Sequence, residues 1–140
     1  MKQIVYVAAP YTSRATGYRT QLLEQTSRAA VVSRYAAIIK HRLGVEVFSP
    51  ITHGHAIWMA GGCELDHTAA GWETVNRAMM DASTALHVLR LRGWEHSTGL
   101  RAEIDYFAER GIAPQWCDVP VEFYKHARER LACHPLESVA

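Results

Sequence analysis

The chain has 140 residues, a length that fits one globular domain able to bury a core without disulfides or metals. Hydrophobic residues make up 49% and charged residues 21%, a balance that excludes a disordered or fibrous chain. The formal net charge of +1 argues against nucleic acid or an anionic membrane surface as a partner, so any bound anion must be held by local groups.

The cysteines and the start of the chain indicate a reducing compartment. The three cysteines are an odd number without CxxC spacing, which argues against a disulfide framework or a zinc ribbon. No basic segment followed by an apolar run opens the sequence, and no stretch is long enough to cross a bilayer. We therefore expect a cytoplasmic protein with a single domain over residues 1–140, frayed from about residue 133.

The first half of the chain predicts a strand, a helix and a second strand. Residues 2–8 form a short β-rich apolar run of the kind found in parallel sheets. Residues 12–20 predict a polar loop. Apolar side chains at steps of three and four over residues 22–43 predict a long helix that Gly44 ends. Residues 45–48 predict the second strand.

The second half alternates in the same way. Residues 51 to about 70 contain three glycines and no clean period, which favours a functional loop with some helix. The remaining pattern predicts a helix over 71–82, a strand over 85–91, a helix from Ser97 to about 110, a strand over 112–117 and a last helix over 121–131. Strands separated by helices indicate a doubly wound, mainly parallel sheet of four to five strands with helices on both faces. Ligands of such sheets bind at the carboxyl ends of the strands.

The segment after the third strand carries the most informative residues. Ser97, Thr98 and Gly99 would open a helix, where free backbone N–H groups can bind a phosphate or a sugar hydroxyl. Ser97 can equally be no more than an N-cap.

Glu103 follows in the second turn of that helix. Its side chain would flank the apolar stripe of Leu100 and Phe107, and a partly desolvated carboxylate there can act as a nucleophile at a sugar carbon. The alternative is a surface glutamate that pairs with Arg101 or another charge.

Three segments resemble the nucleoside 2-deoxyribosyltransferase-like superfamily. Residues 6–11, YVAAPY, are similar to its Y-x-A-G-P-Y opening, and residues 48–53, FSPITH, are similar to its second-strand motif. Residues 93–103, GWEHSTGLRAE, are similar to the G-W-x-x-S-x-G-x-x-x-E segment of small members, a bacterial and phage family of unknown function. The resemblance covers about residues 3–115.

This resemblance implies a flavodoxin-like fold and cleavage of an N-glycosidic bond. The glutamate that matches Glu103 attacks the anomeric carbon in the family, and a free base or water resolves the glycosyl-enzyme. The position of Ser97 holds the 5′ end of the sugar, and its hydroxyl favours a 5′-monophosphate. No cofactor or metal is implied. The substrate-binding positions that match are Tyr6, Ala9, Pro10, Tyr11, His53, Thr84, Trp94, Ser97, Thr98 and Gly99.

Two positions depart from the family pattern. Thr84 occupies the place where the family has an aspartate that contacts the base. Either Asp81, one turn earlier, supplies that acid, or the leaving group is activated from elsewhere, or the activity differs. Ala9 replaces a glycine, which restricts how closely a ligand can approach the loop.

The remaining histidines, tryptophans and arginines admit two roles each. His53, His55 and His67 could hold zinc, although substrate contact or loop packing is favoured, and His87 is expected to be a core residue. Trp94 could stack on a base or pack in the core. Arg14 and Arg19 could reach a phosphate or be solvated. The resemblance implies a homo-oligomer, a dimer or a tetramer, because members of the superfamily often complete the site with a neighbouring subunit, and Trp58 and Trp72 are compatible with such an interface.

Two functions from different classes follow. The first is an N-glycosidase or deoxyribosyltransferase that acts through Glu103 on a nucleoside or its 5′-monophosphate. The second is a non-catalytic nucleotide-binding protein that retains the pocket without the acid. A related glycosidic chemistry on another ligand is a third, and the absence of a P-G-G-x-G-T-x-x-E segment argues against its cytokinin branch.

Overall fold

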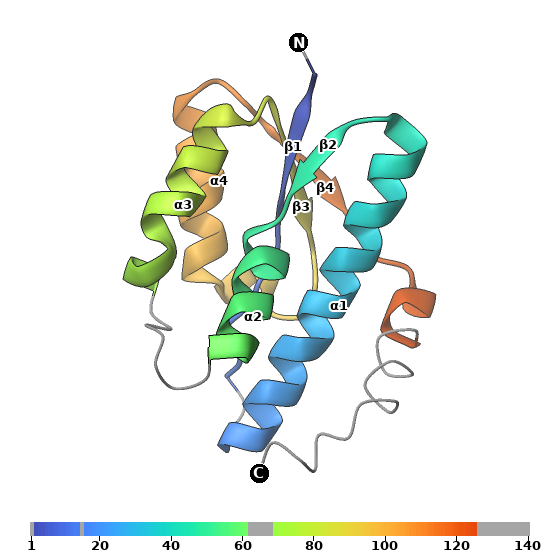
Figure 1. The fold of residues 1–140 in the computed structure, drawn as a ribbon, viewed down its shortest axis with the longest axis vertical. Helices are drawn as coiled ribbons and strands as arrows, with labels where there is room; N and C mark the ends of the chain where they lie inside the picture. The colour runs from blue at the N-terminus through green and yellow to red at the C-terminus, as the bar shows by residue number, and fades with distance from the viewer. Residues whose placement is uncertain (1, 15, 62–68, 126–140) are drawn as a thin grey trace.

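Four parallel strands in the order β2-β1-β3-β4 form the centre of the protein in a computed structural model, which describes residues 2–14, 16–61 and 69–125. Val5 pairs with Val47, Val7 with His87 and Val88 with Trp116. The predicted α/β, flavodoxin-like sheet is confirmed, with every described strand parallel (Figure 1). The strands are β1 (Ile4–Ala8), β2 (Glu46–Phe48), β3 (Ala85–Leu89) and β4 (Pro114–Cys117).

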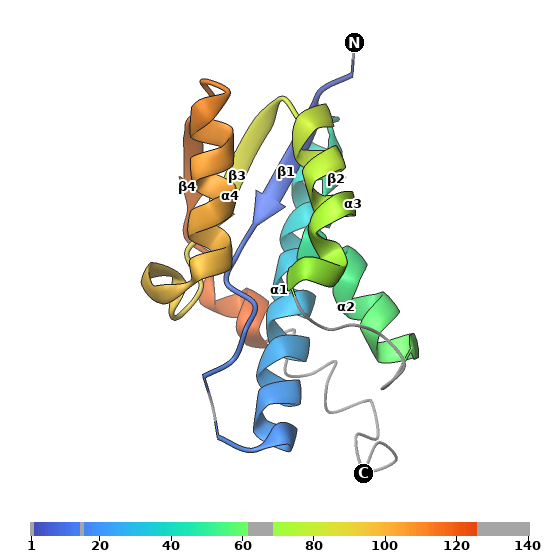
Figure 2. The same cartoon turned by 90° about the vertical axis from the view of Figure 1, so that its left-hand side faces the viewer.

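Helices cover both faces of this sheet. Figure 1 views the strands between α1 on one side and α3 and α4 on the other, and Figure 2 shows α3 and α4 side by side in front of the sheet. Residues 121–125 are also helical and lie on the side of α1. The helices are α1 (Tyr18–Leu43), α2 (Pro50–Gly61), α3 (Ala69–Ala82) and α4 (Thr98–Glu109), with a short 3₁₀ turn, η2 (Trp94–His96), before α4.

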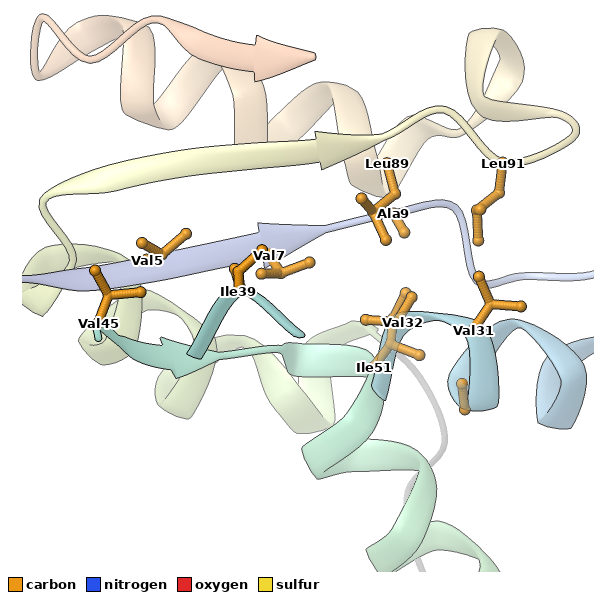
Figure 3. Packing of buried hydrophobic residues seen from close by; sticks show 11 residues of the cluster. Val5, Val7, Ala9, Val31, Val32, Ile39, Val45, Ile51, Leu89 and Leu91 are labelled. Carbon is orange, nitrogen blue, oxygen red and sulfur yellow. The ribbon is translucent and has the colours of Figure 1, made fainter. Parts of the chain in front are cut away.

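The alternation of side chains along β1 gives each face its own core. Val5 and Val7 point toward α1 and pack with Val32 and Leu89 (Figure 3). Tyr6 points the other way and belongs to the core under α3 and α4, which also contains Ala8, Met80, Leu86, Val88, Leu100 and Phe107. One central strand therefore places an aromatic hydroxyl on the α4 face and only aliphatic side chains on the α1 face.

Several boundaries differ from the sequence predictions. The region predicted as a loop with some helix is a regular helix as far as Gly61, because Ile51 and His55, one turn apart, are both buried. β3 stops at Leu89, where the Leu91 amide turns back to the Leu89 carbonyl at 2.9 Å. Residues 62–68 and 126–140, including His67 and the rest of the predicted last helix, lie outside the described residues.

Helix ends follow the expected capping chemistry. Gly44 takes the left-handed conformation, with φ of 64°, and its amide donates to the Lys40 carbonyl at 3.1 Å, so α1 ends where the sequence predicts.

Across the described part of the chain, no helix combines the length and the apolar character needed to span a membrane.

Candidate functional site

Arg28 on α1 fixes the loops that follow β1 and β3. One guanidinium nitrogen donates to the carbonyls of Tyr11 at 3.0 Å and Thr12 at 2.8 Å, and the other donates to the Arg92 carbonyl at 3.1 Å. The second nitrogen also forms an ion pair with Glu24 at 2.7 Å, and the Arg28 side chain is only 12% exposed. The carboxyl edge of the two central strands is thus held in one arrangement by a single side chain.

The start of α4 lies next to this loop system. Ser97 is the N-cap, because its hydroxyl oxygen accepts the Leu100 amide at 3.2 Å, and this bond leaves the hydroxyl proton free to be donated. The guanidinium of Arg14 donates to the His96 carbonyl at 3.3 Å, which places a positive charge beside the N-terminus of the helix. Thr98 and Gly99 are exposed in its first turn.

Glu103 lies one turn further along α4 and points into the protein. The residue is half-buried, but its Oε2 is fully buried and has no hydrogen-bond partner within the described ranges. The Tyr6 hydroxyl is in the same condition on a residue that is 0% exposed. Glu103 forms no ion pair among the described residues, so it is not the surface glutamate of the alternative interpretation.

Burial dominates the electrostatics of this pair. It raises the pKa of Glu103 to about 7, while an interaction with the Tyr6 hydroxyl acts in the opposite direction. The same burial, with the carboxylate nearby, raises the pKa of Tyr6 far above its usual value. The two groups lack a hydrogen bond of ordinary geometry, yet they are close enough to shift each other's pKa, and both keep polar atoms available.

A row of aromatic rings leads away from Tyr6. Its ring lies 5.4 Å from that of Phe107 and 5.7 Å from that of Phe48. The ring of Phe48 in turn lies 5.6 Å from that of His53, which meets Trp72 edge-on at 6.4 Å. The predicted binding residue His53 is therefore connected to Tyr6 through Phe48.

Two predicted residues lie elsewhere. Asp81 is in the last turn of α3 and Thr84 is in the connection from α3 to β3, which in a parallel sheet is at the amino edge of the strands. The Thr84 amide donates to the carbonyl of Ile4, the first residue of β1, at 2.9 Å, and the exposed Asp81 accepts a hydrogen bond from Tyr106. Both residues thus lie at the opposite edge from the start of α4, Asp81 contacts α4 one turn after Glu103, and their predicted roles stay predictions.

The other predicted residues are distributed around the carboxyl edge. Ala9 and Pro10 are buried after β1, and the Tyr11 hydroxyl pairs with His55 Nδ1 at 2.6 Å. Trp94 is half-buried, with its ring 5.4 Å from that of Trp116 on β4, an arrangement in which it packs against the protein.

A cavity of about 280 Å³ opens beside Phe48. It is lined by Ala36, Val47, Phe48, Ser49, Thr52 and His53, but not by Glu103.

The histidines singled out in the sequence have different surroundings in the structure. His53 is exposed and faces Phe48 and Trp72, whereas His55 is buried against Tyr11 and Trp58, so the H-x-H pair does not converge on one point. No group of three metal-ligating side chains is found in the described portion of the chain. His87 is confirmed as a core residue, because Nδ1 meets the Tyr35 hydroxyl at 2.7 Å.

Sequence reasoning missed the roles of Arg28 and of the contact between Tyr11 and His55. Arg28 is one of several polar residues on a long helix, and nothing in its spacing marks the carbonyls that it binds. For His55 a signal existed, since it is one helical turn after the apolar Ile51.

Comparison with known proteins gives one family. The family described as a domain of unknown function (DUF1937) matches residues 3–115, which includes every element from β1 to the start of β4. No curated protein matches the chain.

Proposed function

The chain belongs to the DUF1937 family, and we propose that it cleaves or transfers the N-glycosidic bond of a (deoxy)nucleoside or its 5′-monophosphate, with Glu103 as nucleophile. The observation that carries this proposal is the buried, unpartnered Oε2 of Glu103 beside the Tyr6 hydroxyl, in the part of the chain that the structure describes. A buried carboxyl oxygen without a partner costs stability, and such groups are frequent at sites of ligand chemistry.

The chemistry needs the ionised form of Glu103. A pKa of about 7 gives comparable amounts of carboxylate and carboxylic acid at neutral pH, and desolvation makes the carboxylate more reactive. The carboxylate oxygen would bond to C1′ while the C1′–N bond breaks, and the departing nitrogen would keep the electron pair and take up a proton. Water, or a nitrogen of a second base, would then attack C1′ while the C1′–O bond to Glu103 breaks and its electron pair returns to the carboxylate, and the attacking group would lose a proton.

The groups at the start of α4 support a substrate with a negatively charged 5′ end. Arg14 and the helix N-terminus both favour an anion, and Ser97 has a hydroxyl proton to donate. A free 5′-hydroxyl would use the serine but not the positive charge. We therefore place nucleoside 5′-monophosphates ahead of nucleosides as substrates.

The proposal includes a homo-oligomer, a dimer or a tetramer, located in the cytoplasm. Support for assembly comes from α2, where the apolar side chains of Ile57 and Met59 are 40% and 38% exposed. In the superfamily that the sequence resembles a neighbouring subunit often completes the site, and α2 follows β2 at the carboxyl edge.

One observation favours the second function, a nucleotide-binding protein without catalysis. Asp81 and Thr84 lie at the amino edge of the sheet, where Asp81 accepts a hydrogen bond from Tyr106, and this position supports a protein without the acid that the resemblance implies at the base. A protein of this kind would bind nucleotides and release no base over long incubation.

The test is incubation of the protein with a panel of nucleosides and 5′-monophosphates of ribose and deoxyribose, with and without a second free base. Chromatography of the free base gives the reaction class in one experiment. We expect release from at least one monophosphate and loss of release in Glu103→Gln. The matched control is Glu109→Gln, the same change at an exposed position of the same helix. Unchanged turnover in Glu103→Gln would remove the proposal.

A further inference from the structure

Tyr11 and His55 form a second buried polar pair at the carboxyl edge. Tyr11 follows β1, and His55 lies on the helix that follows the neighbouring strand β2. The Tyr11 hydroxyl lies 2.6 Å from His55 Nδ1, and the two rings meet edge-on at 80°. His55 is 8% exposed, and its Nε2 is buried with no hydrogen-bond partner in the described ranges.

Burial keeps both members of this pair neutral at pH 7. Desolvation lowers the pKa of His55 below its usual value and raises the pKa of Tyr11 far above its own. The contact is therefore between a neutral phenol and a neutral imidazole, which carries one proton on one of its two nitrogens.

The hydrogen bond selects the position of that proton. If the Tyr11 hydroxyl donates to Nδ1, the ring proton is on Nε2 and one buried donor has no partner among the described residues. If Nδ1 carried the proton and donated to the Tyr11 oxygen, the Tyr11 proton and the Nε2 lone pair would both lack a partner among the described residues. The first tautomer leaves fewer buried groups unsatisfied and is the favoured one.

We propose that His55 is a substrate-binding residue that presents Nε2–H to a neutral acceptor on a nucleobase, a carbonyl oxygen or a ring nitrogen. This inference rests on the proposed function and names the group that recognises the base. A neutral donor suits an uncharged acceptor better than a phosphate, which would favour the charged imidazolium. The rings of Tyr11 and Trp58 both pack edge-on against the His55 ring, with centroids 5.7 and 5.6 Å away, so the imidazole has aromatic neighbours on two sides.

Tyr11 acts through His55 as a positioning residue in this arrangement. Its main-chain carbonyl is held by Arg28 at 3.0 Å, so the backbone from which the phenol extends is anchored. The same guanidinium binds the Arg92 carbonyl, which connects the base-recognition pair to the loop before α4.

The first test is the tautomer, read from long-range ¹H–¹⁵N spectra of the histidine rings in the full chain. We expect a proton on Nε2 of His55, assigned by its loss in His55→Phe, and a proton on Nδ1 overturns the inference. In Tyr11→Phe, which removes the donor to Nδ1, we expect the two tautomers of His55 to mix. An unchanged pure Nε2–H spectrum in that variant overturns the positioning role of Tyr11.

The second test is binding, measured by calorimetry in a Glu103→Gln background so that no probe is cleaved. The probes are the four deoxyribonucleoside 5′-monophosphates and deoxyribose 5-phosphate, which has no base. Adding His55→Phe should weaken the best-bound nucleotide by about tenfold or more and leave deoxyribose 5-phosphate unchanged. His55→Gln, which retains an N–H donor, should restore most of the affinity and serves where the phenylalanine variant fails to fold.

Tyr35→Phe is the matched control, because it removes a hydroxyl from the other buried tyrosine–histidine pair, and it should leave nucleotide affinity unchanged. Equal affinity with and without His55→Phe, or no nucleotide binding by the Glu103→Gln protein, overturns the inference. Base release by the wild-type chain would still support the proposed function in either case, so the two failures can be told apart.

Discussion

The two faces of the sheet each bury a polar cluster, and the clusters differ in whether their hydrogen bonds are complete. Under α1, the Tyr35 hydroxyl contacts His87 Nδ1 at 2.7 Å and Cys117 Sγ at 3.1 Å. Under α4, the Tyr6 hydroxyl and Glu103 Oε2 have no hydrogen-bond partner in the described part of the chain. Buried polar groups that satisfy one another stabilise a fold, whereas groups left open are where a ligand has something to bind. The two clusters thus differ in bonding, and this difference supports the proposed role of Tyr6 and Glu103.

The largest expected effect is the difference in base release between a substitution in one cluster and a substitution in the other. Glu103→Gln should lower base release by about 10³-fold or more, because the nucleophile is replaced by an amide that cannot form the ester. Tyr35→Phe should leave release within about twofold, since its partners are all on the other face. Rates from single-turnover chromatography decide this, and a large loss of release in Tyr35→Phe would erase the distinction between the clusters.

The next effect concerns stability and pH. Folding raises the pKa of Glu103 from 4.5 to about 7, so in this interval the folded state binds more protons than the unfolded state and stability falls as pH rises. The amide introduced by Glu103→Gln does not ionise, so the variant lacks this loss. The free energy of unfolding of Glu103→Gln relative to wild type should therefore rise from pH 4.5 to 7, by about 3 kcal/mol in total.

The histidines require that this measurement be a difference between two proteins. Burial lowers the pKa of His55 and of His87, so each of them makes stability rise with pH below its usual pKa, opposite in sign to Glu103. Both histidines are present in wild type and variant, and their contributions cancel in the difference. Urea titrations at several pH values give the required curve, and a difference that stays flat would mean that Glu103 is not desolvated in the folded protein.

A smaller effect is expected from removing the shared hydroxyl of the cluster under α1. Tyr35→Phe leaves His87 Nδ1 and Cys117 Sγ without their shared partner and should destabilise the protein by about 1–2 kcal/mol. Denaturant unfolding at pH 7.5 measures this change. Removal of the corresponding hydroxyl on the other face, in Tyr6→Phe, takes away a group that lacks a partner of ordinary geometry among the described residues and should cost less. A larger loss of stability in Tyr6→Phe than in Tyr35→Phe would contradict the conclusion that only the cluster under α1 has its hydrogen bonds complete.

The smallest effect is a displacement of the pH profile of base release in Tyr6→Phe. The Tyr6 hydroxyl lowers the pKa of Glu103, so its removal should raise that pKa above about 7 and move the acidic limb of the profile to higher pH. The maximal rate at high pH should change less than the rate at pH 6. Profiles from pH 5 to 9 for both proteins measure the displacement, and a shift toward lower pH would show that the hydroxyl does not stabilise the carboxylate.

Sequence patterns predicted what depends on neighbouring positions in the chain. The apolar run of β1, the period of α1 and the glycine that ends it are local signals, and so are the cap at Ser97 and the flanking of Glu103 by Leu100 and Phe107. Contacts across the fold were not accessible in this way. Tyr35 meets His87 and Cys117 only after three elements pack together, and α2 is helical because packing buries Ile51 and His55 despite its glycines.

The position of Asp81 and Thr84 follows from the topology. Asp81 is in the last turn of α3 and Thr84 precedes β3, and every strand of a parallel sheet starts at the same edge, so both lie at the amino edge. The resemblance gave their roles from sequence position alone, and these roles stay predictions. The inward orientation of Glu103, in contrast, followed from its place on the helix.

The guanidinium of Arg28 forms hydrogen bonds to three main-chain carbonyls on the two loops that border the carboxyl edge. Lysine at this position lacks the planar fork and could not serve all three oxygens at once. A substitution of residue 28 would therefore remove hydrogen bonds from both loops at once. No single further substitution would replace them on both loops. An arginine at the equivalent place in another DUF1937 chain would thus indicate that its two loops share this backbone course, and its loss would mark a branch in which they were rebuilt.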